Sequence, residues 1–518
     1  MRITNKIMQS NSLYNINNNK VLQDKLSTQM STQKKITRPS DDPVVAIRAL
    51  RLRTSVSELT QYYEKNAPDA ESWLTVTEKA LGTGTEVLTD MVKQATKGAN
   101  KDLGVEDLTI ITQQMRMLRD EYYSTGNVDY AGRFVFTGYR TDTSLSFTSE
   151  VEDPAVKYDY KKIKEPVKIG DFDTINYTNM SAVDGLNKSN YTSTTYKTVT
   201  EQQITNGDIH RIRLSYDDLK DGVPTISYQS KGGIDVNVTV TKEASAEKAY
   251  QAIAAANAAS PQTEAVIFIP ETGEVLFSDA SYEKLNGAVT TDTEISITYG
   301  KDSWKNGDLR PEHYFTCEEV EITKDGQTEK KVFNKEADVN SQIIEYDVGY
   351  NQKIRVNTLA SEAFSHSVDR DIDDLEIALA SLTEINATVE DLKTLKKNLT
   401  EGTADYETVE QELAAAQKAY DYVRENIHTM FEGTITSIQN YLNKANVAVT
   451  DNGARSSRLD LVSNRLMEQK TTFQTLQSEN EDADISEVAI QLTSTELTYE
   501  AALMATGKIM QTSLMNYI

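Results

Sequence analysis

Both ends of the chain repeat apolar residues at the spacing of an amphipathic helix. In the first 30 residues one stripe contains Ile3, Ile7, Tyr14 and Val21, and Leu26 lies beside it. Side chains three, four or seven positions apart lie on one face of a helix. The pattern therefore predicts that the chain begins with a helix that has an apolar face to cover.

A break and three further helices follow. The apolar repeat stops at Thr37–Asp42, and Asp42-Pro43 is typical of a helix start, because an N-cap Asp accepts hydrogen bonds from free backbone N–H groups and Pro fits the first helical position. We expect helices at about 43–65, 69–97 and 105–125, with glycines marking a turn between the last two.

From about residue 133 the apolar period changes to two, which is typical of strands. Phe134 and Phe136 alternate with other side chains up to Gly138, and Ile295, Ile297 and Tyr299 do the same further along. Two apolar runs in 265–277 surround a four-residue turn and predict a hairpin. One helix is expected within this region, at 246–258.

Helical periodicity resumes after residue 360 and continues to the C-terminus. Val368, Leu375, Leu382 and Val389 are seven residues apart, and a second run follows the break at Gly402. That second helix is expected to end near residue 449, with a bend at Gly433. The final helix begins near Ile485.

The last helix has more apolar surface than one partner can cover. Ile490, Leu497 and Met504 form a second face next to Val488 and Leu492. Helices from other copies of the chain would cover it, and this predicts an assembly protein. A bundle that closes within one chain explains the periodicity equally well, because heptads do not separate packing within a chain from packing between chains.

Composition and charge limit the partners, disulfides and membrane segments that the chain can have. The 518 residues carry a formal charge of -25, which disfavours nucleic acid or anionic lipid as a partner. Residues 1–140 hold 19 Lys and Arg against 16 Asp and Glu, so the acidic excess lies in the remainder. The single cysteine, Cys317, allows no intramolecular disulfide. We expect no cleaved signal peptide and no membrane insertion, since no apolar run is long enough.

No catalytic, cofactor or metal motif is found. Asp369–Asp373 imitates the start of a calcium loop, but position six is Asp374 rather than Gly and position twelve is Ala380 rather than Glu. These aspartates are expected to favour the start of a helix instead. The four histidines are scattered, and no phosphate loop or nucleophile elbow is present. We therefore expect no enzyme activity and no cofactor.

The breaks and ends of the chain resemble the flagellin family. The residues that carry the resemblance are Met1-Arg2-Ile3-Thr4, Arg38-Pro39-Ser40-Asp41-Asp42-Pro43, Phe134-Val135-Phe136-Thr137-Gly138-Tyr139-Arg140-Thr141, Asn452-Gly453-Ala454-Arg455 and the final Ser513-Leu514-Met515-Asn516-Tyr517-Ile518. The similarity covers about 1–145 and 360–518, and it implies that residues 452–455 form a turn into the C-terminal helix. Residues 146–350 lie outside it, as expected of a variable insert.

The resemblance implies a fold that is mainly α with a β-rich insert. In this arrangement 1–40 and 478–518 form terminal coiled-coil segments, while 41–145 and 351–477 form a helical bundle with a β-hairpin. Residues 146–350 form an outer β-rich domain. The N- and C-terminal helices would build the axial part of an assembly.

Within the family, the form of the motif with Pro43 is more similar to hook–filament junction proteins than to filament flagellins. The resemblance implies type III export, location in the extracellular flagellum and polymerisation through the terminal helices. Implied partners are copies of the chain, hook-associated protein 1, flagellin and a cytoplasmic export chaperone on the C-terminal helices. Two alternatives remain: a filament-forming flagellin, and a flagellar scaffold whose insert binds glycans.

Candidate subunit contacts follow from the apolar stripes and the motif. The predicted interface residues are Ile3, Ile7, Tyr14, Val21, Leu26, Leu459, Val462, Leu466, Phe473, Leu476, Val488, Leu492, Leu497, Tyr499 and Leu514. The family motif contributes Arg38, Pro39, Ser40, Asp41, Asp42, Pro43 and Arg48. Arg48, Arg51 and Arg53 belong to a basic cluster that is either a solvated helix face or a contact with acidic surface on a neighbour.

Overall fold

The computed structural model describes residues 5–148, 157–220, 222–322, 328–334 and 341–515. The chain forms two compact units, each built from separate parts of the sequence. The terminal unit contains Met1–Glu71, Tyr346–Ile354 and Ser457–Ile518, and the central unit contains Ser72–Glu345 and Arg355–Ser456. In the described ranges no helix combines the length and the apolar content needed to cross a bilayer.

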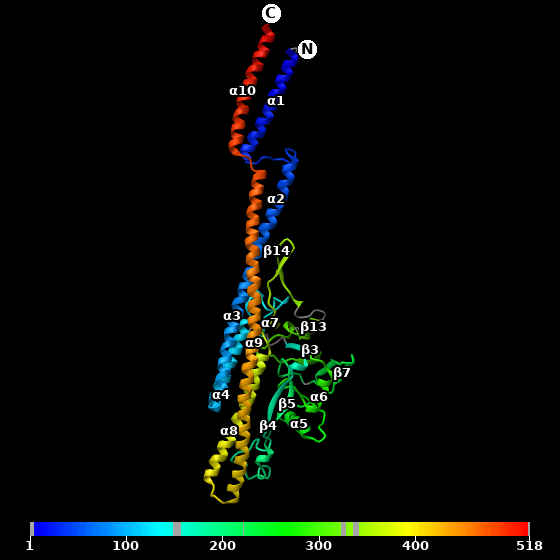
Figure 1. Ribbon diagram of the computed structural model, residues 1–518, viewed down its shortest axis with the longest axis vertical. Helices are drawn as coiled ribbons and strands as arrows, with labels where there is room; N and C mark the ends of the chain where they lie inside the picture. Colours follow the sequence, from blue (N-terminus) through cyan, green and yellow to red (C-terminus); the bar gives the residue numbers. More distant parts are fainter. Residues whose placement is uncertain (1–4, 149–156, 221, 323–327, 335–340, 516–518) are drawn as a thin grey trace. The chain divides into compact units, whose positions relative to one another are not determined.

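The terminal unit is helical. Helix α1 (Asn5–Thr32) and helix α10 (Ile485–Met515) lie side by side, which confirms that the two ends of the chain pack together (Figure 1). Helix α2 (Pro43–Gln61) and the end of α9 (Ala404–Glu481) complete the helical part. A hairpin of β14 (Glu345–Gly349) and β15 (Gln352–Arg355), far from these helices' N-terminal part in the sequence, also belongs to this unit.

The predicted interruption between 65 and 69 is wrong. A single π-turn, Tyr62–Asn66, joins α2 directly to α3 (Ala67–Gly98). Within it the N–H of Ala67 donates to the carbonyl of Tyr62, five residues back. Pro68 has no N–H to donate to an α-helical bond, and the wider π-turn lies just before it.

The helices of the central unit bury apolar side chains. They are α3, α4 (Val105–Thr125), α8 (Ser367–Asn398) and the part of α9 before Ser457, with the short α7 (Ala360–Ala363) beside them. The heptad residues Val368, Leu375, Leu382 and Val389 are all buried, which confirms the predicted stripe. Salt bridges from Arg116 to Asp373 and Glu376 join α4 to α8.

Helix α9 contradicts the predicted turn at 452–455, because it continues through both Gly433 and Gly453. Asn452 is fully buried, and its side-chain amide donates to the carbonyl of Leu74 in α3 at 3.0 Å. The bond is made with a neighbouring helix rather than with the local backbone, so Asn452 stabilises the helix pair and does not end α9.

The β-rich part of the central unit consists of two sheets. The first has the order β4-β5-β10-β9-β8 and the second the order β13-β12-β3-β11-β6-β7. Their bounds are β3 (Lys157–Val167), β4 (Asp173–Asn179), β5 (Thr205–Arg213), β6 (Thr225–Gln229), β7 (Asp235–Val238), β8 (Thr241–Lys242), β9 (Val266–Ile269), β10 (Glu274–Phe277), β11 (Ile295–Lys301), β12 (Thr316–Ile322) and β13 (Thr328–Phe333).

The two sheets enclose a common core, and helix α5 (Ala246–Ala258) covers the other face of the first sheet. Phe268, Phe277, Ile295 and Ile297 belong to the core between the sheets. Ile253 of α5 packs in a second cluster, against side chains from β5, β9 and β10. Helix α6 (Asp279–Ala288) follows β10. Strands β9 and β10 are buried throughout, as expected of strands covered on both faces.

Most predicted elements of the insert are confirmed. The hairpin of β9 and β10, helix α5 and the alternating strand β11 all lie where the pattern placed them. The strand expected at 133–137 is wrong in extent. Only Arg133–Phe134 (β2) pairs, with Asp129–Tyr130 (β1), and the following Val135, Phe136 and Thr137 are all buried, so the period of two ends there. The fold is mainly helical with a β-rich central region, as predicted.

Candidate assembly surface

The candidate functional surface lies on the terminal unit, where the family-like motif and the two terminal helices meet. Residues 33–42 connect α1 to α2, and residues 482–484 connect α9 to α10. The N–H of Lys35 donates to the carbonyl of Glu481 at 2.7 Å, and the N–H of Ala483 donates to the carbonyl of Gln33 at 2.9 Å. These two backbone bonds hold the connections together.

Glu481 is the centre of an ion-pair cluster at this junction. Its carboxylate accepts two hydrogen bonds from the Arg53 guanidinium, from Nε at 2.7 Å and from Nη2 at 2.5 Å. Lys34 Nζ lies 3.6 Å from the same carboxylate and 2.5 Å from Asp482. The bonds from Arg53 and the charge of Lys34 lower the pKa of Glu481. Only 3% of the Glu481 side chain is exposed, so one acidic group ties together α2, α9 and the start of the 33–42 connection.

The motif at 38–43 builds the start of α2. Asp42 caps the helix by accepting from the N–H groups of Val44 at 2.9 Å and Val45 at 3.1 Å, and Pro43 occupies the first turn, as predicted. Asp41 accepts from the N–H of Arg38 at 2.9 Å. The backbone bonds from Arg38 and Thr37 lower the pKa of Asp41, and the bond from Arg38 has the larger effect. The acidic residues of the motif therefore fix the chain direction into α2.

The other motif residues lie at the surface. Arg38, Pro39, Ser40, Pro43 and Arg48 are all exposed. Arg38 and Arg48 form no salt bridge among the described residues of this chain, and Arg51, one turn beyond Arg48, is also exposed. Arg53 differs from its neighbours in the basic cluster because its partner, Glu481, lies within the chain. Arg48 and Arg51 thus leave cationic groups available on α2.

The predicted interface residues fall into three groups. Buried within the chain are Leu26, Leu459, Leu466 and Val488. Half-buried are Val462, Phe473, Leu492 and Tyr499. Exposed are Ile7, Tyr14, Val21, Leu476 and Leu497. Ile3 and the side chain of Leu514 lie outside the described part of the chain.

Packing between α1 and α10 thus uses only part of their apolar surface. Leu26 and Val488 are 3% and 7% exposed, whereas Tyr14 is 68% and Leu497 is 69% exposed. Around Leu497, α10 contributes small side chains that border a shallow hollow: Ala489, Thr493, Ser494, Thr498 and Ala501. A large exposed side chain flanked by small ones suits the close approach of a further helix.

Sequence reasoning missed an apolar row on α2. Val44, Ile47 and Leu50 are exposed, while Ala46 and Ala49 of the same helix are buried. The small residues face inward and the large ones outward, which is the reverse of an ordinary surface helix. The spacing of three, with alanines between the large residues, is visible in the sequence and could have indicated this row.

The terminal unit also contains a groove. It has a volume of about 380 Å³ and is formed by α2, α9 and the tip of the β14–β15 hairpin. Leu59, Leu466 and Phe473 supply apolar walls, and Tyr350 at the hairpin tip is 92% exposed. Exposed aromatic tips and apolar grooves are common features of protein contact surfaces.

In the ranges that the structure describes, no group of three or more His, Cys, Asp or Glu side chains is arranged to hold a metal ion. Asp369, Asp371 and Asp373, the residues of the calcium-like run, form salt bridges with Arg119, Arg213 and Arg116, respectively. Cys317 is buried, and burial raises the pKa of its thiol, which disfavours a reactive thiolate.

Comparison with known proteins finds similarity over the N-terminal part of the chain. Residues 3–141 match the bacterial flagellin N-terminal helical region. Flagellar hook-associated protein 3 of Salmonella typhimurium is 28% identical over 145 residues, which are 28% of this chain and 45% of that protein. The protein of the same name from Escherichia coli K12 gives the same figures. The chain thus spans less than half the length of the curated relatives it matches.

Solved structures of flagellar proteins are also similar. FlgL from Xanthomonas campestris aligns with a TM-score of 0.30 and 12% identity, over 83% of this chain and 99% of that chain. The flagellar junction protein FlgL from Legionella pneumophila aligns with a TM-score of 0.26 and 12% identity, over 80% of this chain and 99% of that chain.

Proposed function

We propose that this chain, which carries the N-terminal helical region of the bacterial flagellin family at residues 3–141, is a hook–filament junction adaptor of the flagellum. The observation that carries the proposal is the uncovered apolar surface of the terminal helices, next to the Arg38–Pro43 motif. The two relatives at 28% identity are both named hook-associated protein 3. Their name and the form of the motif favour a junction protein over other members of the family.

The proposed mechanism is self-assembly through the terminal unit. Burial of apolar surface stabilises association by about 25 cal/mol per Å². Exposed side chains on α1 and α10, such as Tyr14, Ile490 and Leu497, supply this surface. A closed intrachain bundle would bury them, and their exposure therefore supports contacts with other subunits. Copies of the chain would pack α1 and α10 into an axial tube.

The partners follow from the same proposal. In the axial structure the chain would contact copies of itself, with hook-associated protein 1 on one side and flagellin on the other. A cytoplasmic chaperone would hold the C-terminal helices before type III export, because their apolar faces would otherwise promote aggregation. The protein would act outside the cell, as a structural component without catalytic activity, and would bind neither nucleic acid nor membrane.

Deletion with imaging tests this function. Cells that lack the chain should still build hooks but release unpolymerised flagellin into the medium, and restoring the chain should restore filaments. Cells that retain normal filaments after the deletion would rule out the junction role.

A filament-forming flagellin is the second candidate, because the matched N-terminal region is that of flagellin itself. Copy number separates the two. Quantitative mass spectrometry of purified flagella, together with fluorescent labelling, should find the chain as a minor component at the filament base. A chain that forms the bulk of the filament would instead be a flagellin.

A further inference from the structure

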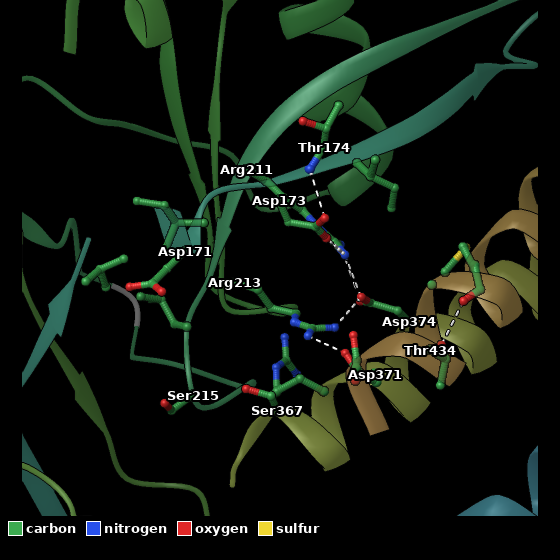
Figure 2. Close-up of a pocket in the computed structure, with 18 of the residues that line it drawn as sticks. Asp171, Asp173, Thr174, Arg211, Arg213, Ser215, Ser367, Asp371, Asp374 and Thr434 are labelled. Carbon is green, nitrogen blue, oxygen red and sulfur yellow. Dashed lines mark hydrogen bonds and ion pairs between the residues drawn. The ribbon is translucent and has the colours of Figure 1, made fainter. Parts of the chain in front are cut away.

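The central unit contains a cavity that the assembly role does not use. It has a volume of about 510 Å³, is partly open to solvent, and lies between strands β3, β4 and β5 on one side and helices α8 and α9 on the other. Figure 2 shows arginines from the strands bonded to aspartates of helix α8 in the wall of this cavity. Its size falls within the range of small-molecule sites, roughly 300–1,000 Å³.

Arginines and aspartates in the cavity wall form ion pairs with one another. The guanidinium groups of Arg211 and Arg213 each donate to Asp374 Oδ2 at 2.6 Å, and Arg213 also pairs with Asp371 (Figure 2). Burial would raise the pKa of Asp374, but the two arginines lower it to about 2, so this carboxyl is ionised. Pairs of this kind hold donors and acceptors in fixed positions.

This arrangement disfavours ions as ligands. Glu165, Asp171 and Asp173 also line the cavity, so an anion would meet carboxylates. A cation would meet Arg370, which lines the same space and is 4% exposed. An ion that displaced one of the existing pairs would leave a buried charge without its partner.

A neutral ligand with many hydroxyl groups meets no such cost. Arg370 lines the cavity, and its guanidinium donates to Asp373 Oδ2 at 2.9 Å. Hydroxyl groups of Ser215, Ser367 and Ser437 line the cavity as well. Hydroxyl groups both donate and accept, and can therefore bond with guanidinium, carboxylate and serine groups without net charge.

The rest of the wall suits the C–H faces of a sugar ring. Ile175, Ile212 and Met430 provide apolar contacts. A smaller cavity of about 160 Å³ shares Ile175 and Met430 with the first, and Tyr177 and Tyr250 line it. The two tyrosine rings stack with centroids 5.1 Å apart and an interplanar angle of 20°. Aromatic faces beside fixed polar groups are typical of sites for small ligands.

A helix glycine keeps the cavity open at its rim. Gly433 lines the cavity from α9, and a Cβ added there would meet no atom within 4 Å. Glycine inside a helix destabilises it by about 1 kcal/mol relative to alanine. Packing does not require the glycine, so the missing side chain leaves room for another molecule.

From this geometry we propose that the cavity binds a neutral saccharide of one or two sugar rings. The strand arginines and helix aspartates orient the hydroxyl groups, and the apolar and aromatic walls contact the ring faces. The proposal is independent of the assembly role, so failure of one leaves the other standing.

Saturation-transfer difference NMR on the full chain tests the proposal. The probes are glucose, N-acetylglucosamine, maltose, lactose and chitobiose, with sulfate and spermidine titrations followed by calorimetry as charged alternatives. At least one sugar should give a saturable signal. No signal from any of the five sugars, or calorimetric binding of sulfate or spermidine alone, would overturn the proposal.

Two matched variants locate the site. Gly433→Leu fills the cavity rim, whereas Gly453→Leu adds the same side chain to the same helix at a position that has no atom within 4 Å and is absent from the cavity wall. Sugar affinity should fall about tenfold or more in Gly433→Leu and stay unchanged in Gly453→Leu. Ser437→Leu, a second change in the wall, should also weaken binding. Circular dichroism confirms folding, and equal affinity in all three variants would contradict this location.

Discussion

The carboxylate of Glu481, the last residue of α9, accepts two hydrogen bonds from the guanidinium of Arg53 in α2, at 2.7 and 2.5 Å. These residues are 428 positions apart in the sequence. Their bond joins the N-terminal and C-terminal parts of the terminal unit just where α9 gives way to α10. Bidentate pairs of this kind fix orientation as well as supplying energy.

Replacing Glu481 with Gln should destabilise the terminal unit by about 1–2 kcal/mol at pH 7, since Arg53 and Lys34 are themselves partly exposed. Thermal unfolding and limited proteolysis of the 33–42 connection measure the effect. The exposed Glu479 offers the control, because Glu479→Gln should leave both unchanged. Equal behaviour of the two variants would show that the pair contributes nothing.

The same pair predicts a pH dependence. Because its folded-state pKa is lowered, Glu481 contributes stability above its unfolded pKa of about 4.3, and that contribution is lost as the pH falls below this value. The difference in stability between the native chain and Glu481→Gln should therefore shrink between pH 5 and pH 3, as measured by urea unfolding at each pH. A constant difference across this window would contradict the assignment.

Leu497 and Val488 should separate assembly from folding. Leu497→Gln changes an exposed residue and should alter monomer stability by less than about 0.5 kcal/mol while blocking polymerisation. Val488→Ala opens a gap in the buried seam with α1 and should cost about 1–2 kcal/mol of stability. Urea unfolding and filament counts measure the two effects. Normal filament numbers with Leu497→Gln would argue against subunit contacts on this face.

Arg48 and Arg51 test the electrostatic part of the surface. Reversing both to Glu should reduce filament attachment about tenfold, because the acidic surface of a neighbouring subunit would repel the new charges. Filaments per cell and motility give the readout. Lys65→Glu with Lys79→Glu makes the same charge change at exposed positions elsewhere and should have little effect. If both double variants behave alike, α2 is simply a solvated helix face.

Glu412 should affect the pH dependence of stability in the opposite direction. It is 1% exposed, neither carboxyl oxygen has a hydrogen-bond partner in the described part of the chain, and burial raises its pKa to about 7. The stability that it contributes in its protonated form is complete below its unfolded pKa of about 4.3 and is lost as the pH rises through 7.

Glu412→Gln should therefore stabilise the central unit by about 2–3 kcal/mol at pH 8 and have little effect near pH 4. Urea unfolding at the two pH values measures this difference. The exposed Glu407 on the same helix provides the control, as Glu407→Gln should have no such pH-dependent effect. A loss of stability in Glu412→Gln at pH 8 would contradict the prediction.

Local chemistry was sufficient to predict much of the fold. Apolar spacing placed α1, α8 and α10, the turn between two apolar runs placed the β9–β10 hairpin, and the Asp42-Pro43 pair placed the start of α2. Each of these signals acts over a few residues, through backbone capping or the period of one face. That is why they could be interpreted without knowing what packs against them.

Tertiary structure decided what those local signals left open. Asn452 and Gly453 indicate a turn by local preference, yet α9 continues because Asn452 is buried and bonded to α3. Arg53 belonged to an apparently uniform basic cluster, and only the position of Glu481 distinguishes it from Arg48. Which apolar residues are buried by their own chain and which are exposed likewise depends on the packing of distant helices. The sequence by itself determined where most of the helices and several of the strands form, because those signals depend on neighbouring residues. The tertiary structure alone decided which charges are paired and which apolar faces remain uncovered, because those depend on residues hundreds of positions apart.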